Sequence, residues 1–400
     1  CSANWRAIPP RPPLPDQLFK PPKALRQQWR DQSASAGLTS CSNDKDAANG
    51  SGPERQQPAF LQIGEFSINR ISPERTEVRD GAGRTLVLIP REAAMPTDVR
   101  PSQVVRTPVQ RVAAYGAFDI AVLRALGVLE QTLVGVTSPA QRWYIPEIRQ
   151  GMEAGRIAYL GDAASIDFER LKQSNPELVL TWDPGVIPLL DDLGIPAVVT
   201  TTPTAMCLNT RMRFVQFLAP FFHKEREAES YFARIDAALS DIRARTAGLA
   251  HQPKVMWGDI YEKRVMVEPG NAWVGELVGL AQSDYQFKDV FGTACIEITV
   301  ERFLYSGQDA DIFFTYRTGE MGATSKEALA KLNPLIRDIG PLKRGRVYAP
   351  LPHYSQSADR LDEILTEISA ILHPEAYPNY RLRYFTELPN TEPPPVKEQS

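Results

Sequence analysis

The chain has 400 residues, 43% of them hydrophobic, and a formal net charge of −3. This length and hydrophobic content predict two folded domains with additional segments. Lysine and arginine are scattered rather than clustered, so we exclude nucleic acid as a partner. No run of about 20 apolar residues predicts a membrane-spanning helix.

The composition of residues 1–60 predicts a flexible, proline-rich tether. The segment is rich in Pro, Gln, Ser, Asn and Gly, a composition that cannot bury a core. It begins with Cys1, and a cysteine at this position is typical of a bacterial lipoprotein after signal cleavage. Arbitrary trimming of the sequence is the alternative. We expect Cys1 to carry a lipid, because a long tether follows it.

Region 61–202 predicts an N-terminal hairpin followed by an α/β lobe. Apolar segments 66–71 and 86–89 flank turn residues at 80–83, which favours an antiparallel hairpin. Strand patterns then alternate with helical patterns, which predicts a mostly parallel sheet. The strands are expected at 111–115, 132–136, 178–182 and 197–201, and one helix at 120–126.

Region 203–250 predicts a linker that contains one long helix. No proline interrupts residues 224–249, and apolar side chains recur with helical spacing from Ala228 to Ile242. At 1.5 Å per residue such a helix would be roughly 35 to 40 Å long, enough to join one lobe to another.

Region 251–372 predicts a second α/β lobe. Strand patterns occur at 255–257, 265–267, 312–316 and 347–349, and helical patterns at 274–280 and 359–372. Residues 373–400 are predicted to form a polar tail.

An internal repeat relates the two lobes. Residues 167–171, DFERL, precede the strand pattern at 178–182, and residues 299–303, TVERF, precede the pattern at 312–316. In each copy a capping residue and a Glu-Arg pair open a short helix, and the next strand ends in an aromatic residue. We expect two similar lobes whose strand-end aromatics, Trp182 and Tyr316, face each other across a cleft.

The order and spacing of these elements resemble the periplasmic binding proteins that deliver iron-siderophores, haem and vitamin B12 to ABC importers. The resemblance spans about residues 86–372. The resemblance is based on short motifs that occur in the same order and spacing as in the family. They are Asp80–Thr85, Arg111-Val112, Leu126-Gly127 with Val134–Val136, Asn175–Leu180, Leu193–Pro196 and Asp309–Ile312. It implies the class III fold, which has two Rossmann-like α/β lobes with mostly parallel central sheets. One long α-helix joins the lobes, and the ligand is held between them.

The resemblance also assigns a role to the repeated glutamates. In this family one glutamate from each lobe docks onto arginines of the membrane permease, and Glu169 and Glu301 occupy the matching positions. Carboxylates fixed on rigid lobe tips can form charge-assisted bonds to guanidinium groups. The alternative is that each is only a helix-start residue, favoured by the helix dipole by about 0.3–1 kcal/mol.

Residues just after the predicted strands form the candidate ligand site, because ligands of α/β folds bind at the carboxyl ends of strands. They are mostly aromatic, which suits a large, flat or greasy metal chelate, and two arginines can pair with its negative charge. Each can also be ordinary packing at a strand end. The set is Tyr115, Phe118, Arg142, Trp143, Tyr144, Trp182, Trp257, Tyr261, Tyr316, Arg317, His353 and Tyr354.

Three of these positions bear on the identity of the ligand. The resembled vitamin B12 binder also carries a tryptophan at the position of Trp182, but its second tryptophan is replaced here by Cys295, which disfavours B12. His353 could bind a metal centre or be a hydrogen-bonded loop histidine. Cys295 could be a soft ligand or a buried structural thiol.

No catalytic motif and no protein metal site is predicted. We therefore expect no enzyme and no intrinsic cofactor, but a ligand that contains chelated iron or cobalt. The expected partners are an ABC importer permease dimer with its ATPase and a membrane reached through the lipid on Cys1. The protein is expected to be monomeric and extracytoplasmic, either anchored to the cell membrane or in the periplasm. The alternative is a surface lipoprotein sensor or interaction module with the same fold and no permease.

Overall fold

The computed structural model describes residues 59–202, 206–261, 264–292 and 295–391. Cys1 and nearly all of the predicted tether lie outside these residues. Ala59 and the residues that follow it belong to one compact unit. Within the described ranges, no helix has both the length and the apolar character needed to cross a membrane.

A five-stranded sheet opens the described chain. Its strands, in spatial order, are β1 (Phe60–Ile63), β2 (Phe66–Ser72), β3 (Arg75–Arg79), β4 (Thr85–Pro90) and β5 (Val104–Thr107). The predicted pairing of 66–71 with 86–89 is wrong, because β3 lies between β2 and β4 and pairs antiparallel with both. The sequence does not predict β3, because Val78 is its only buried side chain and the strand therefore lacks an alternating apolar pattern.

The second sheet forms an N-terminal lobe with helices packed around it. Its order is β10-β9-β6-β7-β8, and every neighbouring pair is parallel, as predicted. The strands are β6 (Val112–Ala114), β7 (Leu133–Val136), β8 (Ala158–Tyr159), β9 (Leu178–Thr181) and β10 (Ala197–Val199). The helices are α2 (Ala117–Ala125), α3 (Leu129–Thr132), α4 (Pro146–Glu153), α5 (Phe168–Gln173) and α6 (Ile187–Asp192). The strand order reverses between β6 and β9, the place where α/β sheets bind ligands.

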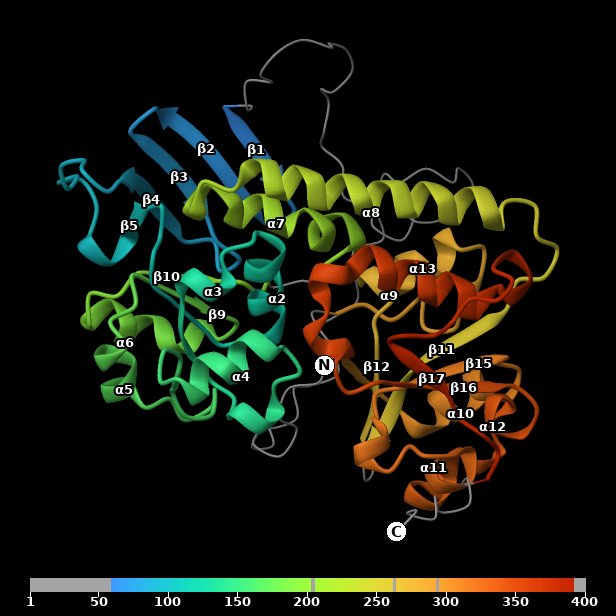
Figure 1. The fold of residues 1–400 in the computed structure, drawn as a ribbon. Coiled ribbons are helices and arrows are strands. Elements are labelled where there is room, and N and C mark those ends of the chain that lie inside the picture. The colour runs from blue at the N-terminus through green and yellow to red at the C-terminus, as the bar shows by residue number, and fades with distance from the viewer. Residues whose placement is uncertain (1–58, 203–205, 262–263, 293–294, 392–400) are drawn as a thin grey trace, which may run out of the picture. The chain divides into compact units, whose positions relative to one another are not determined.

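Two helices, rather than one, connect the N-terminal lobe to the rest of the chain. The predicted long helix is α8 (Glu225–Thr246), but a second helix, α7 (Leu208–Phe222), precedes it. The sequence conceals α7 because Pro220 lies inside it and its buried side chains leave no clear polar face. Figure 1 shows α7 and α8 side by side, and α8 also packs against α13 (Leu361–Leu372).

The third sheet forms a C-terminal lobe of mixed topology. Its order is β14-β12-β11-β15-β16-β17, with β13 also beside β11. Strand β11 is parallel to β13 and β15, and β15 is parallel to β16. The remaining pairs, β11 with β12, β12 with β14 and β16 with β17, are antiparallel. The strands are β11 (Lys254–Tyr261), β12 (Arg264–Val267), β13 (Asp284–Tyr285), β14 (Ile296–Ile298), β15 (Ile312–Thr315), β16 (Arg346–Pro350) and β17 (Phe385–Glu387).

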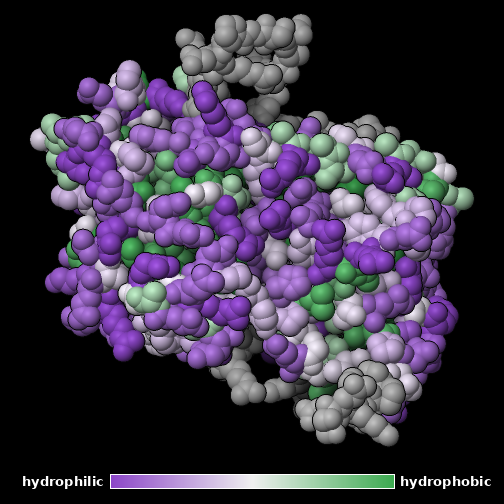
Figure 2. Space-filling model, in the orientation of Figure 1, coloured by the Kyte–Doolittle hydropathy of each residue, from purple (hydrophilic) through white to green (hydrophobic). Residues whose placement is uncertain are grey.

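Helices of the C-terminal lobe include the predicted final helix, which appears as α13. The others are α9 (Trp273–Leu280), α10 (Val300–Gln308), α11 (Lys326–Leu332) and α12 (Gly340–Lys343). The segment predicted as a tail contributes β17 instead, because Tyr384, Phe385 and Leu388 are buried and β17 pairs with β16. The face of the molecule in Figure 2 is mainly hydrophilic, and its hydrophobic residues form separate patches.

Candidate functional site

The two copies of the repeat have the same local structure. Asp167 caps α5 and its side chain accepts a hydrogen bond from the Arg170 amide at 3.0 Å. Thr299 caps α10 in the same way, with its hydroxyl accepting from the Arg302 amide at 3.2 Å. The aspartate and threonine therefore fix the start of each helix, as the sequence predicts.

Both repeated glutamates lie exposed in the first turn of their helices. Glu169 and Glu301 each occupy the second helical position, and neither forms a hydrogen bond or ion pair with a residue in the described ranges. Each carboxylate is therefore available to an external cation. Their docking role stays a prediction.

The repeat extends beyond the helices into the turns that follow β9 and β15. The buried hydroxyl of Thr181 accepts from the Asp183 amide at 3.0 Å, and that of Thr315 accepts from the Arg317 amide at 3.2 Å. Each turn presents one aromatic residue. Trp182 is 37% exposed and Tyr316 is half-buried.

Three further residues follow β6 at the carboxyl ends of the N-terminal strands. Tyr115 is buried, its hydroxyl has no hydrogen-bond partner among the described residues, and burial raises its pKa. A Cβ placed on Gly116 would lie 2.9 Å from Oδ2 of Asp119, so the glycine leaves room for that carboxylate, and it would meet the Trp182 ring at an ordinary contact distance of 3.5 Å. Asp119, which sequence reasoning missed, is 1% exposed, and burial raises its pKa to about 7 against hydrogen bonds from Thr200 and Gly116.

Two of the predicted tryptophans are core residues. Trp143 is 3% exposed and its indole Nε1 donates to the Ser138 carbonyl at 3.0 Å. Trp257 lies inside β11 rather than after it, and its ring stacks on Phe314 with 4.3 Å between centroids. Their assignment to the ligand site is corrected, because both side chains are enclosed by protein.

Residues 142–144 connect the N-terminal lobe with the C-terminal lobe. Arg142 is exposed, and its carbonyl accepts from the Gln356 side-chain amide at 2.7 Å. The Tyr144 amide donates to Oε1 of Gln356 at 2.8 Å, and the Tyr144 hydroxyl donates to Glu320 at 2.9 Å. Arg142 and Tyr144 therefore lie at a junction between the lobes.

Arg317 is engaged within the C-terminal lobe. Its Nε lies 2.9 Å from Oδ2 of Asp259, and its guanidinium carbon lies 4.4 Å from the Tyr261 ring centroid. Burial raises the pKa of Asp259 to about 6, and the charge of Arg317 opposes that shift. Burial also raises the pKa of Tyr261 to about 12. This pairing does not support the prediction that Arg317 serves a ligand anion.

Tyr316 belongs to a polar cluster that the sequence reveals only in part. Its hydroxyl hydrogen-bonds to the carboxylate of Glu268 and lies 3.3 Å from Sγ of Cys295. The Tyr285 hydroxyl donates to the Glu268 carbonyl at 2.6 Å. Burial raises the pKa of Glu268 and that of Tyr316. Glu268 directly follows β12, a position that could have marked it as a candidate.

His353 and Tyr354 follow β16, as predicted. The His353 ring centroid is 5.7 Å from that of Tyr384, and the Tyr354 ring centroid is 4.7 Å from that of Phe385. In the described part of the chain, no group of three or more histidine, cysteine, aspartate or glutamate residues could hold a metal ion.

Arg211 of α7 lies between residues of the two lobes, and sequence reasoning missed it. Its guanidinium carbon is 4.7 Å from the ring centroid of Phe118 in α2 and 4.9 Å from that of Trp273 in α9. Burial lowers its pKa, while Tyr354, Tyr231 and Glu268 act in the opposite direction. The predicted residue Phe118 thus contacts this cation, and the predicted residue Tyr354 acts on its pKa.

A separate cavity of about 520 Å³ lies on the C-terminal lobe. Its lining includes Lys254 and Asp284, which begin β11 and β13, so it is at the amino ends of these strands. None of the predicted ligand-binding residues lines it.

The sequence model of the periplasmic binding protein family matches residues 112–350, which is more than half of the chain. The chain belongs to this family. That assignment confirms the resemblance found in the sequence, and the fold is the class III fold of the family, as predicted.

Relatives and solved structures agree with the assignment. An uncharacterized lipoprotein of Methanocaldococcus jannaschii is 26% identical over 71% of this chain and 70% of its own length. A periplasmic haem-binding protein from Pseudomonas aeruginosa superposes with a TM-score of 0.55 at 18% identity, covering 72% of this chain and 100% of that chain. The periplasmic haem-binding protein RhuT from Roseiflexus sp. RS-1 gives a TM-score of 0.52 at 18% identity, with 67% and 99% coverage.

Within this family fold, six of the predicted site residues have contrasting environments. Trp182, Tyr316, Phe118 and Tyr354 lie at strand ends or at Arg211, whereas Trp143 and Trp257 belong to the core. The family implies a bound solute and an ABC transporter as partner. It also indicates an extracytoplasmic location, in keeping with the lipoprotein relative.

Proposed function

We propose that the protein captures a metal chelate, an iron-siderophore, haem or a corrinoid, between its lobes and delivers it to an ABC importer permease. The observation that carries the proposal is the pair of equivalent threonine turns after β9 and β15, which present Trp182 and Tyr316 from opposite lobes. Aromatic side chains bury a large area of a flat chelate at low entropic cost. The haem-binding proteins that share the fold support the ligand class.

The chemistry proposed is binding without bond formation or cleavage. Captured chelate should therefore be recovered unchanged, which mass spectrometry of the released ligand tests. We also propose that a lipid on Cys1 anchors the chain, a view supported by the relative named as a lipoprotein. Metabolic labelling with a clickable fatty acid should mark the wild type and fail in Cys1→Ala.

A fluorescence titration tests the proposed ligand class. The full chain is titrated with haem, cyanocobalamin and a panel of ferric siderophores while tryptophan emission is followed. We expect saturable quenching by at least one chelate and about 3- to 10-fold weaker binding by Trp182→Ala. Trp143→Phe, a change at a core indole, should bind as the wild type does. A flat response to the whole panel would contradict the proposal and favour a sensor or interaction module.

A further inference from the structure

Arg211 holds a positive charge where the two lobes approach each other. It lies in the first turns of α7, and its guanidinium contacts one aromatic ring from each lobe, Phe118 at 4.7 Å and Trp273 at 4.9 Å. Cations are attracted to the faces of aromatic rings, and more strongly where water is excluded. The rings therefore hold the guanidinium in place without neutralising its charge.

The guanidinium lacks a counter-ion among the residues that the structure describes. Its Nε is buried without a hydrogen-bond acceptor, and no described carboxylate forms an ion pair with it. Glu268 is the carboxylate whose charge acts on Arg211, but the two groups form no ion pair, and the Glu268 carboxylate is hydrogen-bonded to the Tyr316 hydroxyl instead. An unpaired cation in a desolvated site is costly, which gives an incoming anion a strong advantage.

Arg317, one of the two arginines predicted for the ligand site, is already paired. Arg317 forms an ion pair with Asp259, whose carboxyl is almost fully buried. Arg211 is placed differently, since the groups that contact its guanidinium are the aromatic rings of Phe118 and Trp273. A guanidinium with five N–H donors is well suited to bind a carboxylate or catecholate through charge-assisted hydrogen bonds.

We propose that Arg211 is the anion-binding residue of the cleft and that the ligand is a chelate bearing anionic oxygens, either carboxylate or catecholate. This inference rests on the proposed function and narrows its ligand class. It disfavours neutral chelates. Phe118 and Trp273 orient the guanidinium, so the ligand anion is bound by residues of both lobes and of α7.

Chelates of different charge test the inference. Haem and a ferric tris-catecholate are the anionic probes, and cyanocobalamin and a neutral ferric trishydroxamate are the neutral ones. Each is titrated against the wild type, Arg211→Met and Arg211→Lys. We expect the wild type to bind an anionic probe, Arg211→Met to bind it about 10- to 100-fold more weakly, and Arg211→Lys to fall between them.

The matched control is Arg213→Met, the same change two positions along α7, where Nε of Arg213 donates to Gln216 at 3.0 Å. It should bind the anionic probe as the wild type does, and thermal melts of all variants report whether they fold. Unchanged affinity in a folded Arg211→Met, or a wild type that binds only neutral probes, would overturn the inference and leave the proposed function standing. A wild type that binds no probe would overturn both.

Discussion

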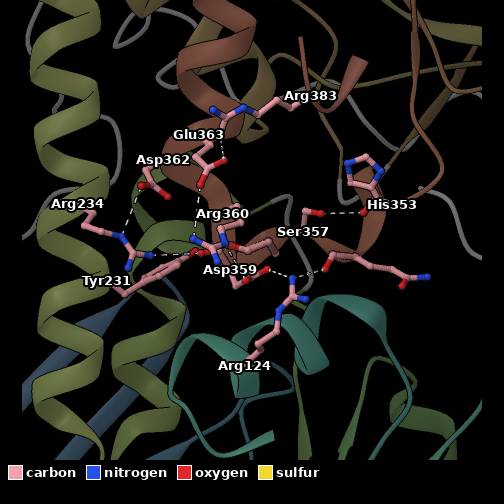
Figure 3. A network of polar contacts seen from close by, with 12 residues as sticks. Arg124, Tyr231, Arg234, His353, Ser357, Asp359, Arg360, Asp362, Glu363 and Arg383 are labelled. Carbon is pink, nitrogen blue, oxygen red and sulfur yellow. Dashed lines mark hydrogen bonds and ion pairs between the residues drawn. The ribbon is translucent and has the colours of Figure 1, made fainter. Parts of the chain in front are cut away.

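The guanidinium of Arg124 lies 2.5 Å from Oδ1 of Asp359, which joins α2 of the N-terminal lobe to the turn before α13. Figure 3 shows this pair within a network that also includes Tyr231 and Arg234 of α8. The Tyr231 hydroxyl donates to the Ala358 carbonyl at 2.6 Å, and Nε of Arg234 lies 3.5 Å from Asp362. The lobes are therefore connected by polar contacts in addition to the helices between them.

Breaking the Arg124–Asp359 pair should destabilise the protein. Asp359 is 6% exposed, so Arg124→Met would leave a buried carboxylate without its strongest partner. We expect the free energy of unfolding to fall by about 1.5–3 kcal/mol in urea denaturation. Arg264→Met is the control, because its pair with Glu297 is on the surface, and no measurable change is expected there. Equal effects of the two substitutions would contradict the role of burial.

Replacing Trp257 should reduce the stability of the protein far more than replacing Trp182. Trp257→Ala removes a ring that is 3% exposed and stacked on Phe314, so we expect the free energy of unfolding to fall by about 3–5 kcal/mol. Trp182→Ala removes a ring that is 37% exposed and should affect stability much less. Urea denaturation of both variants checks this. A larger loss for Trp182→Ala would show that the structure assigns their environments wrongly.

These two tryptophans also show where sequence reasoning stops. Alternation of strands and helices predicts β9, β11 and α8, and the capping residues Asp167 and Thr299 mark the helix starts of the repeat. Both tryptophans lie in or next to predicted strands, and the local pattern does not distinguish a core indole from an exposed one. That difference is decided by residues far away in the sequence, such as Phe314 against Trp257.

Arg211 is a second example of a long-range effect. Its helix, α7, is buried on most sides and contains Pro220, so periodicity does not reveal it. The aromatic rings that flank Arg211 come from Phe118 and Trp273, which are more than a hundred residues apart in the chain. Only the packing of both lobes against α7 brings these groups together.

Asp119 should make stability depend on pH. Its folded pKa of about 7 is above the ordinary value of 3.8, so between these values the folded protein binds a proton that the unfolded chain releases. The stabilisation is fully present below about pH 4 and is lost as pH rises through about 7. We expect Asp119→Asn to remove a contribution on the order of 1–3 kcal/mol from the difference in unfolding free energy between pH 5 and pH 8.

Urea denaturation of the wild type and of Asp119→Asn at both pH values measures this contribution. Other carboxylates, such as Glu177 with its pKa lowered beside Arg91, give the opposite slope, so the comparison between the two proteins is the informative quantity. Parallel pH dependences in the two proteins would show that Asp119 keeps an ordinary pKa in the fold.

Reversing the charges of Glu169 and Glu301 should abolish transport and spare ligand binding. Both carboxylates are exposed at the second position of a helix, without a partner in the described ranges, so their removal breaks no contact that positions the strand-end aromatics. The helix dipole favours an acid there by only about 0.3–1 kcal/mol, so the double variant Glu169→Arg with Glu301→Arg should fold. Transport is measured as uptake of a labelled chelate by cells that contain the importer, and affinity by fluorescence titration.

Glu327→Arg is the matched control for the docking prediction. Glu327 also occupies the second position of a helix, after the capping residue Ser325, but it belongs to no repeat and pairs with Lys331 on the surface. Because docking is predicted only for the repeated glutamates, uptake should be lost in the double variant and retained in the control. Loss of uptake in both would point to a general effect of added positive charge, and loss of ligand affinity in the double variant would place the glutamates in the binding site instead.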